Sequence, residues 1–355
     1  MLYDTDDVRI IGTKEVIAPK SAMERVPISE QSSELIFSLR QQVGDIIAGT
    51  DSRLLIVVGP CSIHDPESAL EYAHKLSQTA NELEDDLCIL MRVYFEKPRT
   101  SIGWKGLLND PHLNGSFRIN EGLLVARQLL SDISELRLGV ATEYLDPITP
   151  QYLGDYVSWS AIGARTTESQ IHRQLASGLS CPVGFKNTTQ GDIRPAAHAV
   201  KSAFYPHRFL SVTKSGDAAI FATAGNPDCH IVLRGGGGAT NYDNKSIKGA
   251  CDILRSEGLN HRVMVDMSHA NSNSDYRNQL GVCDSLCNQL EGGEHCIMGV
   301  MIESHLIAGR QDIGNGRDLV YGQSITDACL GWEQTRKCLN RLAKSVHARN
   351  SLISN

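Results

Sequence analysis

Eight short apolar runs that alternate with helix-like stretches constrain the fold of this chain more than any other feature. The runs are continuous rather than alternating in polarity, which is typical of parallel strands covered on both faces. Eight parallel strands, each followed by a helix, predict an α/β fold, a (β/α)8 TIM barrel, and a doubly wound open sheet is the alternative. The runs lie at residues 54–58, 88–93, 138–142, 159–162, 182–185, 230–233, 263–265 and 297–302.

The chain has 355 residues, and a barrel of this kind needs about 250. The surplus falls in two places. Residues 1–50 precede the first run and form an N-terminal extension, and residues 205–228 read as an inserted β-hairpin with strands at 209–213 and 218–222. We therefore expect one elaborated catalytic barrel over residues 51–350, because neither a repeat nor a low-complexity linker divides it.

Composition excludes several classes of function. The formal net charge is −7, from 34 basic and 41 acidic residues, which argues against nucleic-acid binding and against adhesion to an anionic membrane. No apolar stretch approaches the roughly 18 residues of a membrane-spanning helix, and the first residues lack the pattern of a signal peptide. Ten scattered cysteines without a CxxC motif are typical of a reduced compartment, and we expect a cytoplasmic protein.

Positive charge gathers at the predicted strand ends. In a (β/α)8 barrel the C-terminal ends of all strands meet at one face, which carries the active site. Six cations at one mouth of an acidic protein repel one another unless an anion binds there, and phosphates and carboxylates suit them. The residues are Arg92, Lys97, Arg99, Arg165, Lys186 and Arg234.

The same strand ends carry four candidate metal ligands, Cys61, His269, Glu303 and Asp327. A thiolate, an imidazole and two carboxylates suit Mn, Fe, Co or Zn and suit Ca poorly. Singly, each has a structural explanation: a packed thiol, a capping residue, an ion-pair partner and the N-cap of the last helix. Four together favour a metal site. The alternative, Cys61 as a nucleophile with His269 as its base, leaves both carboxylates without a role.

Nine motifs, in order over nearly the whole chain, resemble the class I, aromatic-amino-acid-regulated 3-deoxy-D-arabino-heptulosonate 7-phosphate (DAHP) synthases, most closely the phenylalanine-sensitive type. They are GPCSIHDP (59–66), MRVYFEKPRT (91–100), GWKGLLNDP (103–111), GARTTESQIHR (163–173), CPVGFKN (181–187), VLRGG (232–236), SHANS (268–272), MIESH (301–305) and SITDACLGWE (324–333).

The resemblance implies the condensation of phosphoenolpyruvate with erythrose 4-phosphate and water, which gives DAHP and phosphate in the first step of the shikimate pathway. It implies that Cys61, His269, Glu303 and Asp327 hold a divalent metal ion, with Mn²⁺ favoured and Fe²⁺, Co²⁺ or Zn²⁺ as alternatives. Lys97, Glu143 and Lys186 are the expected catalytic residues, and Lys186, or a water held by Glu143, is our hypothesis for handling protons. The implied substrate-binding residues are Arg92, Lys97, Pro98, Arg99, Thr100, Ala164, Arg165, Lys186 and Arg234.

In the family that the chain resembles, the extension and the hairpin build subunit contacts and a site for an aromatic amino acid inhibitor. We therefore expect a homodimer or homotetramer. Ser211 favours phenylalanine as the inhibitor, whereas Phe221 is bulkier than expected; tyrosine, tryptophan, or a hairpin that only mediates subunit contacts are the alternatives. The implied regulatory residues are Asp6, Asp7, Asp146, Pro150, Gln151, Leu175, Leu179, Ser180, Phe209, Ser211 and Phe221.

The chain departs from the family pattern at two loops. Thr188 and Gln190 stand in a segment that is usually Gly-Thr-Asp-Gly, and Gly237 stands where the family usually has Lys. Thr188 would be strained if its backbone needed a positive φ. We interpret these changes as drift without loss of activity.

Three further interpretations stay open. The related 3-deoxy-octulosonate 8-phosphate synthases use arabinose 5-phosphate, but the KPRT segment and the long extension argue against that substrate. A catalytically inactive barrel that only senses an amino acid is disfavoured by the four intact ligands. Finally, Cys329 lies two residues after Asp327, and oxidation is expected to link it to Cys61, with helix packing as the alternative role of Cys329.

Overall fold

Eight parallel strands close into a barrel in this computed structural model, which describes residues 3–99, 101–314 and 318–353. The order around the barrel is β1-β10-β9-β8-β5-β4-β3-β2, and β1 pairs with both β2 and β10, so the predicted barrel is confirmed and the open sheet is wrong. The strands are β1 (Leu54–Gly59), β2 (Leu87–Arg92), β3 (Gly139–Glu143), β4 (Val157–Ile162), β5 (Val183–Lys186), β8 (Cys229–Leu233), β9 (Val263–Asp266) and β10 (Ile297–Glu303).

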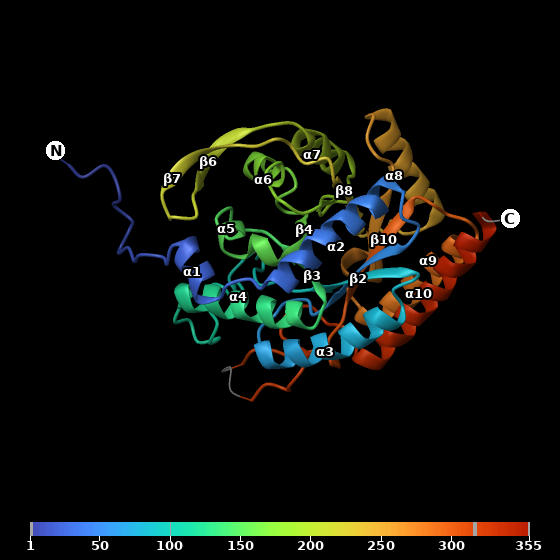
Figure 1. Cartoon of the computed structure of the whole chain (residues 1–355), viewed down its shortest axis with the longest axis horizontal. Coiled ribbons are helices and arrows are strands. Elements are labelled where there is room, and N and C mark those ends of the chain that lie inside the picture. The colour runs from blue at the N-terminus through green and yellow to red at the C-terminus, as the bar shows by residue number, and fades with distance from the viewer. Residues whose placement is uncertain (1–2, 100, 315–317, 354–355) are drawn as a thin grey trace.

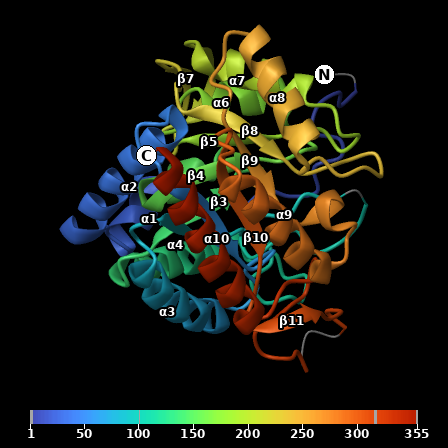
Figure 2. The ribbon, with the colours of Figure 1, turned by 90° about the vertical axis from the view of Figure 1, so that its right-hand side faces the viewer.

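Helices surround this barrel (Figure 1), and α9 and α10 pack side by side on its outside (Figure 2). Local sequence starts several of them: Asp65 accepts hydrogen bonds from the backbone N–H groups of Glu67 and Ser68, and Asp243 accepts one from that of Ser246. The helices between and after the strands are α3 (Pro66–Glu82), α4 (Ile119–Glu135), α5 (Pro150–Leu153), α6 (Gln170–Ala176), α7 (Arg194–Phe204), α8 (Asn244–Ser256), α9 (Gln279–Glu291) and α10 (Trp332–Ile353).

The last helix begins later than the sequence pattern indicates. It starts at Trp332 rather than at Thr326, so Asp327 is not its N-cap and Cys329 does not pack from a helix. The backbone of Cys329 instead pairs with that of Gly309 in β11 (Ile307–Arg310), which lies beside the short strand β12 (Gln323–Ser324). This pairing holds the segment around Asp327 at the mouth of the barrel.

The N-terminal extension contributes to the core of the barrel. It contains α1 (Pro19–Arg25) and α2 (Glu30–Ala48), and Val43, Ile46 and Ile47 of α2 share one buried cluster with the inward-facing residues of the strands. Arg262, just before β9, donates to the carbonyl oxygen of Ile46. Helix α2 therefore closes the barrel at the N-terminal ends of its strands and leaves the opposite face open.

The inserted hairpin forms as predicted, with β6 (Arg208–Val212) antiparallel to β7 (Ala218–Ala222). It curves over α5 and α6 toward α1 (Figure 1), and the backbone N–H of Lys20 donates to the carbonyl of Lys214 at 2.7 Å. The segment before α1 leads away from the barrel.

Among the described residues, no helix is both long enough and apolar enough to cross a membrane.

Packing inside the barrel generates a first prediction. The indole of Trp159 is fully buried, and a Cβ atom at Gly184 would lie 2.5 Å from its Cζ2 atom and 2.7 Å from Cγ2 of Val232. Gly184→Ala should therefore lower the free energy of unfolding in urea by about 1–3 kcal/mol. Gly249→Ala is the control, because Gly249 lies in α8 with open space around its Cα, and there the change should raise stability by about 0.5–1 kcal/mol. Equal effects of both variants would contradict the packing argument.

Candidate active site

Polar side chains from nearly every strand meet at the C-terminal rim of the barrel. Because the strands are parallel, residues at their ends share one face even when they are far apart in sequence. This places together most of the residues that the sequence singled out, and adds Asp266. They are Cys61 after β1, Arg92 at the end of β2, Glu143 of β3, Lys186 of β5, Arg234 after β8, Asp266 of β9 and Glu303 of β10.

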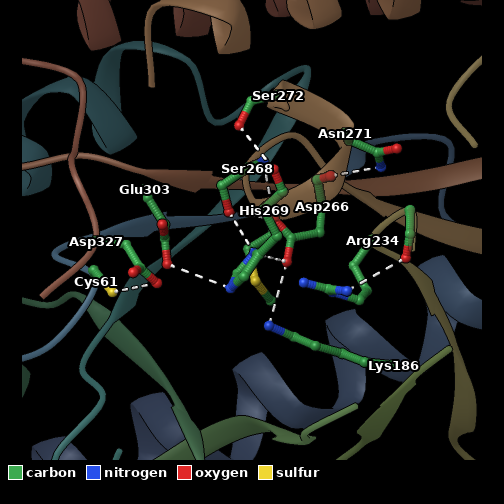
Figure 3. A network of polar contacts seen from close by, with 12 residues as sticks. Cys61, Lys186, Arg234, Asp266, Ser268, His269, Asn271, Ser272, Glu303 and Asp327 are labelled. Carbon is green, nitrogen blue, oxygen red and sulfur yellow. Dashed lines mark hydrogen bonds and ion pairs between the residues drawn. The ribbon is translucent and has the colours of Figure 1, made fainter. Parts of the chain in front are cut away.

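Three of the four predicted metal ligands lie together at one side of this rim, and His269 lies beside them (Figure 3). One donor atom each of Cys61, Glu303 and Asp327 lies within 4.8 Å of the others, and Nε2 of His269 is 3.9 Å from Oε1 of Glu303. Cys61 and Glu303 are buried, whereas Asp327 is exposed at the mouth. His269 has φ +57°, a strained backbone conformation that is typical of functional sites in residues other than glycine. Sulfur, nitrogen and oxygen donors at this spacing fit a transition-metal ion.

The electrostatics around Cys61 favour a ligand over a nucleophile. Burial raises the pKa of its thiol to about 11, and the charge of Glu303 adds to this, while Lys97 opposes it. The Lys97 ammonium lies 3.2 Å from the sulfur, and the thiol is 3.6 Å from Oδ2 of Asp327. The Nδ1 atom of His269 is engaged by Asp266 and Ser268 instead. A bound divalent ion would supply the positive charge that a thiolate needs here.

Arg92 connects the metal-ligand cluster to the loop after β1. Its side chain is 1% exposed and forms a 3.0 Å ion pair with Glu303. It also donates to the carbonyl oxygens of Pro60 and Cys61, and its guanidinium lies 3.5 Å from the centre of the Tyr94 ring. Arg92 therefore fixes both a predicted ligand side chain and the backbone that carries another.

A second group of cations lies across the rim. Nζ of Lys186 is 3.2 Å from Oδ2 of Asp266 and 3.8 Å from Oε2 of Glu143. Burial lowers the pKa of the Arg234 guanidinium, and the negative charge of Asp266 opposes this effect. The positive charge of Arg165 lowers the pKa of Arg234 further. Arg165 directly follows Ala164. A bound anion would offset the positive charge that Arg165 places beside Arg234.

The far end of the site follows Lys97. Arg99 is exposed, and its Nε atom donates to the carbonyl oxygen of Trp104. Pro98, which precedes Arg99 in the sequence, is half-buried. Thr100 lies outside the described residues. Glu96, which the sequence analysis did not single out, is buried and accepts hydrogen bonds from the backbone N–H groups of Leu145 and Asp146. Burial raises the pKa of the Glu96 carboxyl to about 8, although these two hydrogen bonds act to lower it.

The two loops that depart from the family pattern contact each other. Thr188 is not among the described residues with positive φ, so the expected strain does not arise, and its hydroxyl oxygen accepts from the backbone N–H of Asp192. Gly237 has φ +58°, and a Cβ atom there would lie 2.6 Å from the carbonyl oxygen of Gln190. A lysine at 237 would not fit this conformation, so glycine at 237 matches the altered loop at 188–190.

The predicted regulatory residues divide between four places. Seven line one cavity of about 360 Å³ between α5, the end of α6 and the hairpin, which we call the hairpin cavity: Pro150, Gln151, Leu175, Leu179, Phe209, Ser211 and Phe221. Asp146 lines another cavity, of about 710 Å³, with Glu96 and Thr149. Asp6 and Asp7 belong to the exposed segment before α1, and Ser180 follows Leu179 without lining the hairpin cavity.

Cys329 is buried close to Cys61, and its thiol is 3.5 Å from the carbonyl oxygen of Asp327. Burial raises the pKa of this thiol well above its ordinary value, and the charges of Glu303 and Cys61 add to the shift. Both cysteines are free thiols. A disulfide between them on oxidation stays a prediction, which the peptide masses of peroxide-treated protein would test.

Comparison with known proteins identifies relatives over nearly the whole chain. The model of the DAHP synthetase I family matches residues 25–340. The phospho-2-dehydro-3-deoxyheptonate aldolase of Haemophilus influenzae is 53% identical over 350 residues, covering 99% of this chain and 97% of the relative. The Phe-sensitive enzyme of Escherichia coli K12 is 54% identical over 349 residues, covering 98% and 99%. A solved structure of the aldolase from Francisella tularensis SCHU S4 superposes with a TM-score of 0.94 at 50% identity, covering 96% of this chain and 99% of that one.

The buried carboxyl of Glu96 generates a second prediction. Its pKa of about 8 in the folded protein exceeds the ordinary value of glutamate, so between about pH 4.5 and pH 8 the folded state keeps a proton that the unfolded state has lost. The free energy of unfolding should fall as pH rises through this range, by up to about 1.4 kcal/mol per pH unit. Glu96→Gln cannot ionise and should lack this part of the decline in urea unfolding measured from about pH 5 to pH 8. Glu82→Gln, on the exposed end of α3, should decline as the unaltered protein does; equal slopes for all three proteins would show that Glu96 ionises normally.

Proposed function

The chain belongs to the DAHP synthetase I family, and from this premise we propose that the rim described above is its active site, with the roles assigned below. The protein is a phospho-2-dehydro-3-deoxyheptonate aldolase, or DAHP synthase, which joins phosphoenolpyruvate to erythrose 4-phosphate and water and releases phosphate in the first step of the shikimate pathway. Members of this family depend on a metal ion. One observation carries the proposal: buried cations that suit anionic substrates and a set of candidate metal ligands lie on the same face of the barrel.

Cys61, His269, Glu303 and Asp327 would hold the divalent ion. The mutual spacing of the Cys61, Glu303 and Asp327 donor atoms supports this, as does the 3.9 Å distance from Nε2 of His269 to Oε1 of Glu303. Mn²⁺ is our preferred ion, and Fe²⁺, Co²⁺ or Zn²⁺ also suit a mixed set of sulfur, nitrogen and oxygen donors. When bound, the ion supplies Lewis acidity for the aldehyde oxygen of erythrose 4-phosphate.

The cations of the rim would bind the two anionic substrates. Arg165, Lys186 and Arg234 would hold the phosphate and carboxylate of phosphoenolpyruvate through charge-assisted hydrogen bonds, with Arg92, Lys97 and Ala164 completing the pocket. Pro98, Arg99 and Thr100 would contact erythrose 4-phosphate, whose own phosphate suits an exposed guanidinium. Burial of Lys186 and exposure of Arg99 support this order from the inside outward.

Proton transfer would fall to Lys186 and Glu143. Carbon 3 of phosphoenolpyruvate attacks the aldehyde carbon, whose oxygen gains a proton, and water adds at carbon 2 and loses one proton. The C–O bond to phosphate then breaks as the new carbon 2 hydroxyl becomes the ketone, and the hydroxyl proton leaves with the phosphate. Lys186, or a water held by Glu143, would handle these protons, and the 3.8 Å separation of their charged groups supports a shared role. Lys97, which contacts the Cys61 thiol, would lie between the two substrates.

Metal removal gives a third prediction. The stripped protein should form no DAHP from phosphoenolpyruvate and erythrose 4-phosphate, and added Mn²⁺ should restore product formation, whereas arabinose 5-phosphate should be a poor substrate. Lys186→Ala, assayed with saturating substrates and Mn²⁺, should lower turnover roughly 100-fold or more. Activity that does not depend on metal would overturn the ligand assignment, and near-normal turnover of the variant would overturn the role of Lys186. Binding of an amino acid without any turnover would favour a sensing protein.

We also propose that the hairpin cavity binds an aromatic amino acid inhibitor, with phenylalanine favoured. Support comes from its lining, in which the Phe209 and Phe221 rings lie 6.1 Å apart beside Ser211, and from relatives named for sensitivity to phenylalanine, tyrosine and tryptophan. Because Asp6 and Asp7 lie outside the cavity of their own chain, a role for them there requires a second subunit. Residues 1–50 would accordingly serve subunit contacts in a homodimer or homotetramer, and residues 51–350 catalysis.

Inhibition assays give a fourth prediction. Phenylalanine should inhibit more strongly than tyrosine, because the Ser211 side chain fills space that the tyrosine hydroxyl needs. Ser211→Gly should open that space and strengthen inhibition by tyrosine roughly tenfold, about 1.4 kcal/mol. Ser215→Gly, in the exposed hairpin turn outside the cavity, should leave both inhibition constants unchanged. An unchanged preference in Ser211→Gly would show that another residue sets the selectivity.

A further inference from the structure

We propose that Asp266 is a positioning residue that couples the metal-ligand side of the site to the phosphoenolpyruvate side. The inference rests on the proposed function, because it takes His269 as a metal ligand and Lys186 as a phosphoenolpyruvate contact. Asp266 is the last residue of β9 and is fully buried. It lies between the two groups that the proposed function separates (Figure 3).

A single carboxylate oxygen of Asp266 meets both partners. Its Oδ2 atom is 2.9 Å from Nδ1 of His269 and 3.2 Å from Nζ of Lys186. These distances allow one oxygen to take part in two charge-assisted contacts, and a change in either partner alters how strongly the oxygen attracts the other. Asp266 is therefore in direct contact with both halves of the site.

The surroundings of Asp266 leave its carboxylate little freedom. Its other oxygen, Oδ1, accepts from the backbone N–H of Ser268 at 3.0 Å and from the Ser268 hydroxyl at 2.6 Å. Its own carbonyl accepts from the side-chain amide of Asn271 at 2.8 Å. Two neighbouring strands flank β9. A carboxylate held in this way can orient its partners rather than follow them.

For His269, the contact fixes which nitrogen faces the metal ligands. A carboxylate at Nδ1 favours the tautomer with its proton on Nδ1, which leaves the Nε2 lone pair directed toward Glu303. Carboxylates behind metal-bound imidazoles act in this way, and their loss typically costs 10–100-fold in metal affinity.

For Lys186, the same contact makes its availability depend on His269. A cation held by Nε2 would withdraw electron density from the imidazole and strengthen the electrostatic attraction between the Nδ1–H group and Oδ2 of Asp266. That oxygen then attracts the Lys186 ammonium less, so the lysine is freer to bind the anion of phosphoenolpyruvate. Metal should therefore raise the affinity for phosphoenolpyruvate, and by linkage phosphoenolpyruvate should raise the affinity for metal by the same factor.

Two binding titrations of the full-length protein test this coupling without turnover. The first follows Co²⁺ by the thiolate-to-metal absorption that Cys61 would give, and the second follows phosphoenolpyruvate by calorimetry with and without Co²⁺. In Asp266→Asn the affinity for Co²⁺ should fall about 10–100-fold. The ratio of the two phosphoenolpyruvate dissociation constants, without and with Co²⁺, should fall toward one. A ratio that matches the unaltered protein would overturn the proposal and assign the coupling to direct attraction between the ion and the substrate.

Two further variants separate a specific effect from damage to the fold. Glu143→Gln changes the other carboxylate near Lys186 but leaves the His269 contact in place, so it should alter phosphoenolpyruvate binding and leave the affinity for Co²⁺ unchanged. Ser268→Ala removes one contact of Asp266 and the hydroxyl beside Nδ1 of His269, but it leaves the Asp266 carboxylate in place. It should reduce the coupling in part, which keeps the proposal testable if Asp266→Asn fails to fold. Full coupling in Ser268→Ala and a weaker affinity for Co²⁺ in Glu143→Gln would both count against it. Failure of the proposed function is distinct, because the unaltered protein would then show no Co²⁺–thiolate absorption.

Discussion

The buried ion pair between Arg92 and Glu303 is the contact on which the rest of the site depends. Both side chains are at most 2% exposed, and breaking such a pair by removing one partner typically costs about 3–5 kcal/mol. The pair joins β2 to β10, which lie on either side of β1, and Arg92 also donates to two carbonyls of the loop that carries Cys61. Its charge offsets one carboxylate within the metal-ligand cluster, so the remaining negative groups can face an ion.

Much of the fold could be predicted because its strands carry a strong local signal. Strands buried on both faces leave continuous apolar runs, and the eight runs match β1 to β5 and β8 to β10 closely at their ends. The start of α10 was wrong for a physical reason. The segment around Cys329 has helix-like spacing, but its backbone pairs with Gly309 and Leu330 pairs with Glu303. Such long-range pairing leaves no trace in local periodicity.

The candidate site divides in the same way. Residues at strand ends could be found because the C-terminal ends of all strands in a (β/α)8 barrel meet at one face. A residue at a strand end can therefore be placed at that face even when the residues that it contacts are unknown. Asp266 stands at a strand end but was assigned no role, and Glu96 was missed, because the importance of each lies in what it contacts. Asp266 contacts Lys186 and His269, and Glu96 contacts two backbone N–H groups of the β3–α5 connection. Family resemblance likewise placed Asp146 with the regulatory residues but could not show that it lines a different cavity.

Helix α2 determines from which end of the barrel a molecule can reach the site. Because its apolar face fills the end of the barrel where the strands begin, the opposite rim is the way in and the way out. The groups assigned to phosphoenolpyruvate lie deep, with Lys186 at 3% exposure, whereas Arg99 stands exposed at the outer end. Under the proposed assignment, a substrate at the inner position would have to enter through this rim before a second substrate covers it. Closure of the opposite end by α2 would in this way favour one order of binding, although α2 contacts neither substrate site.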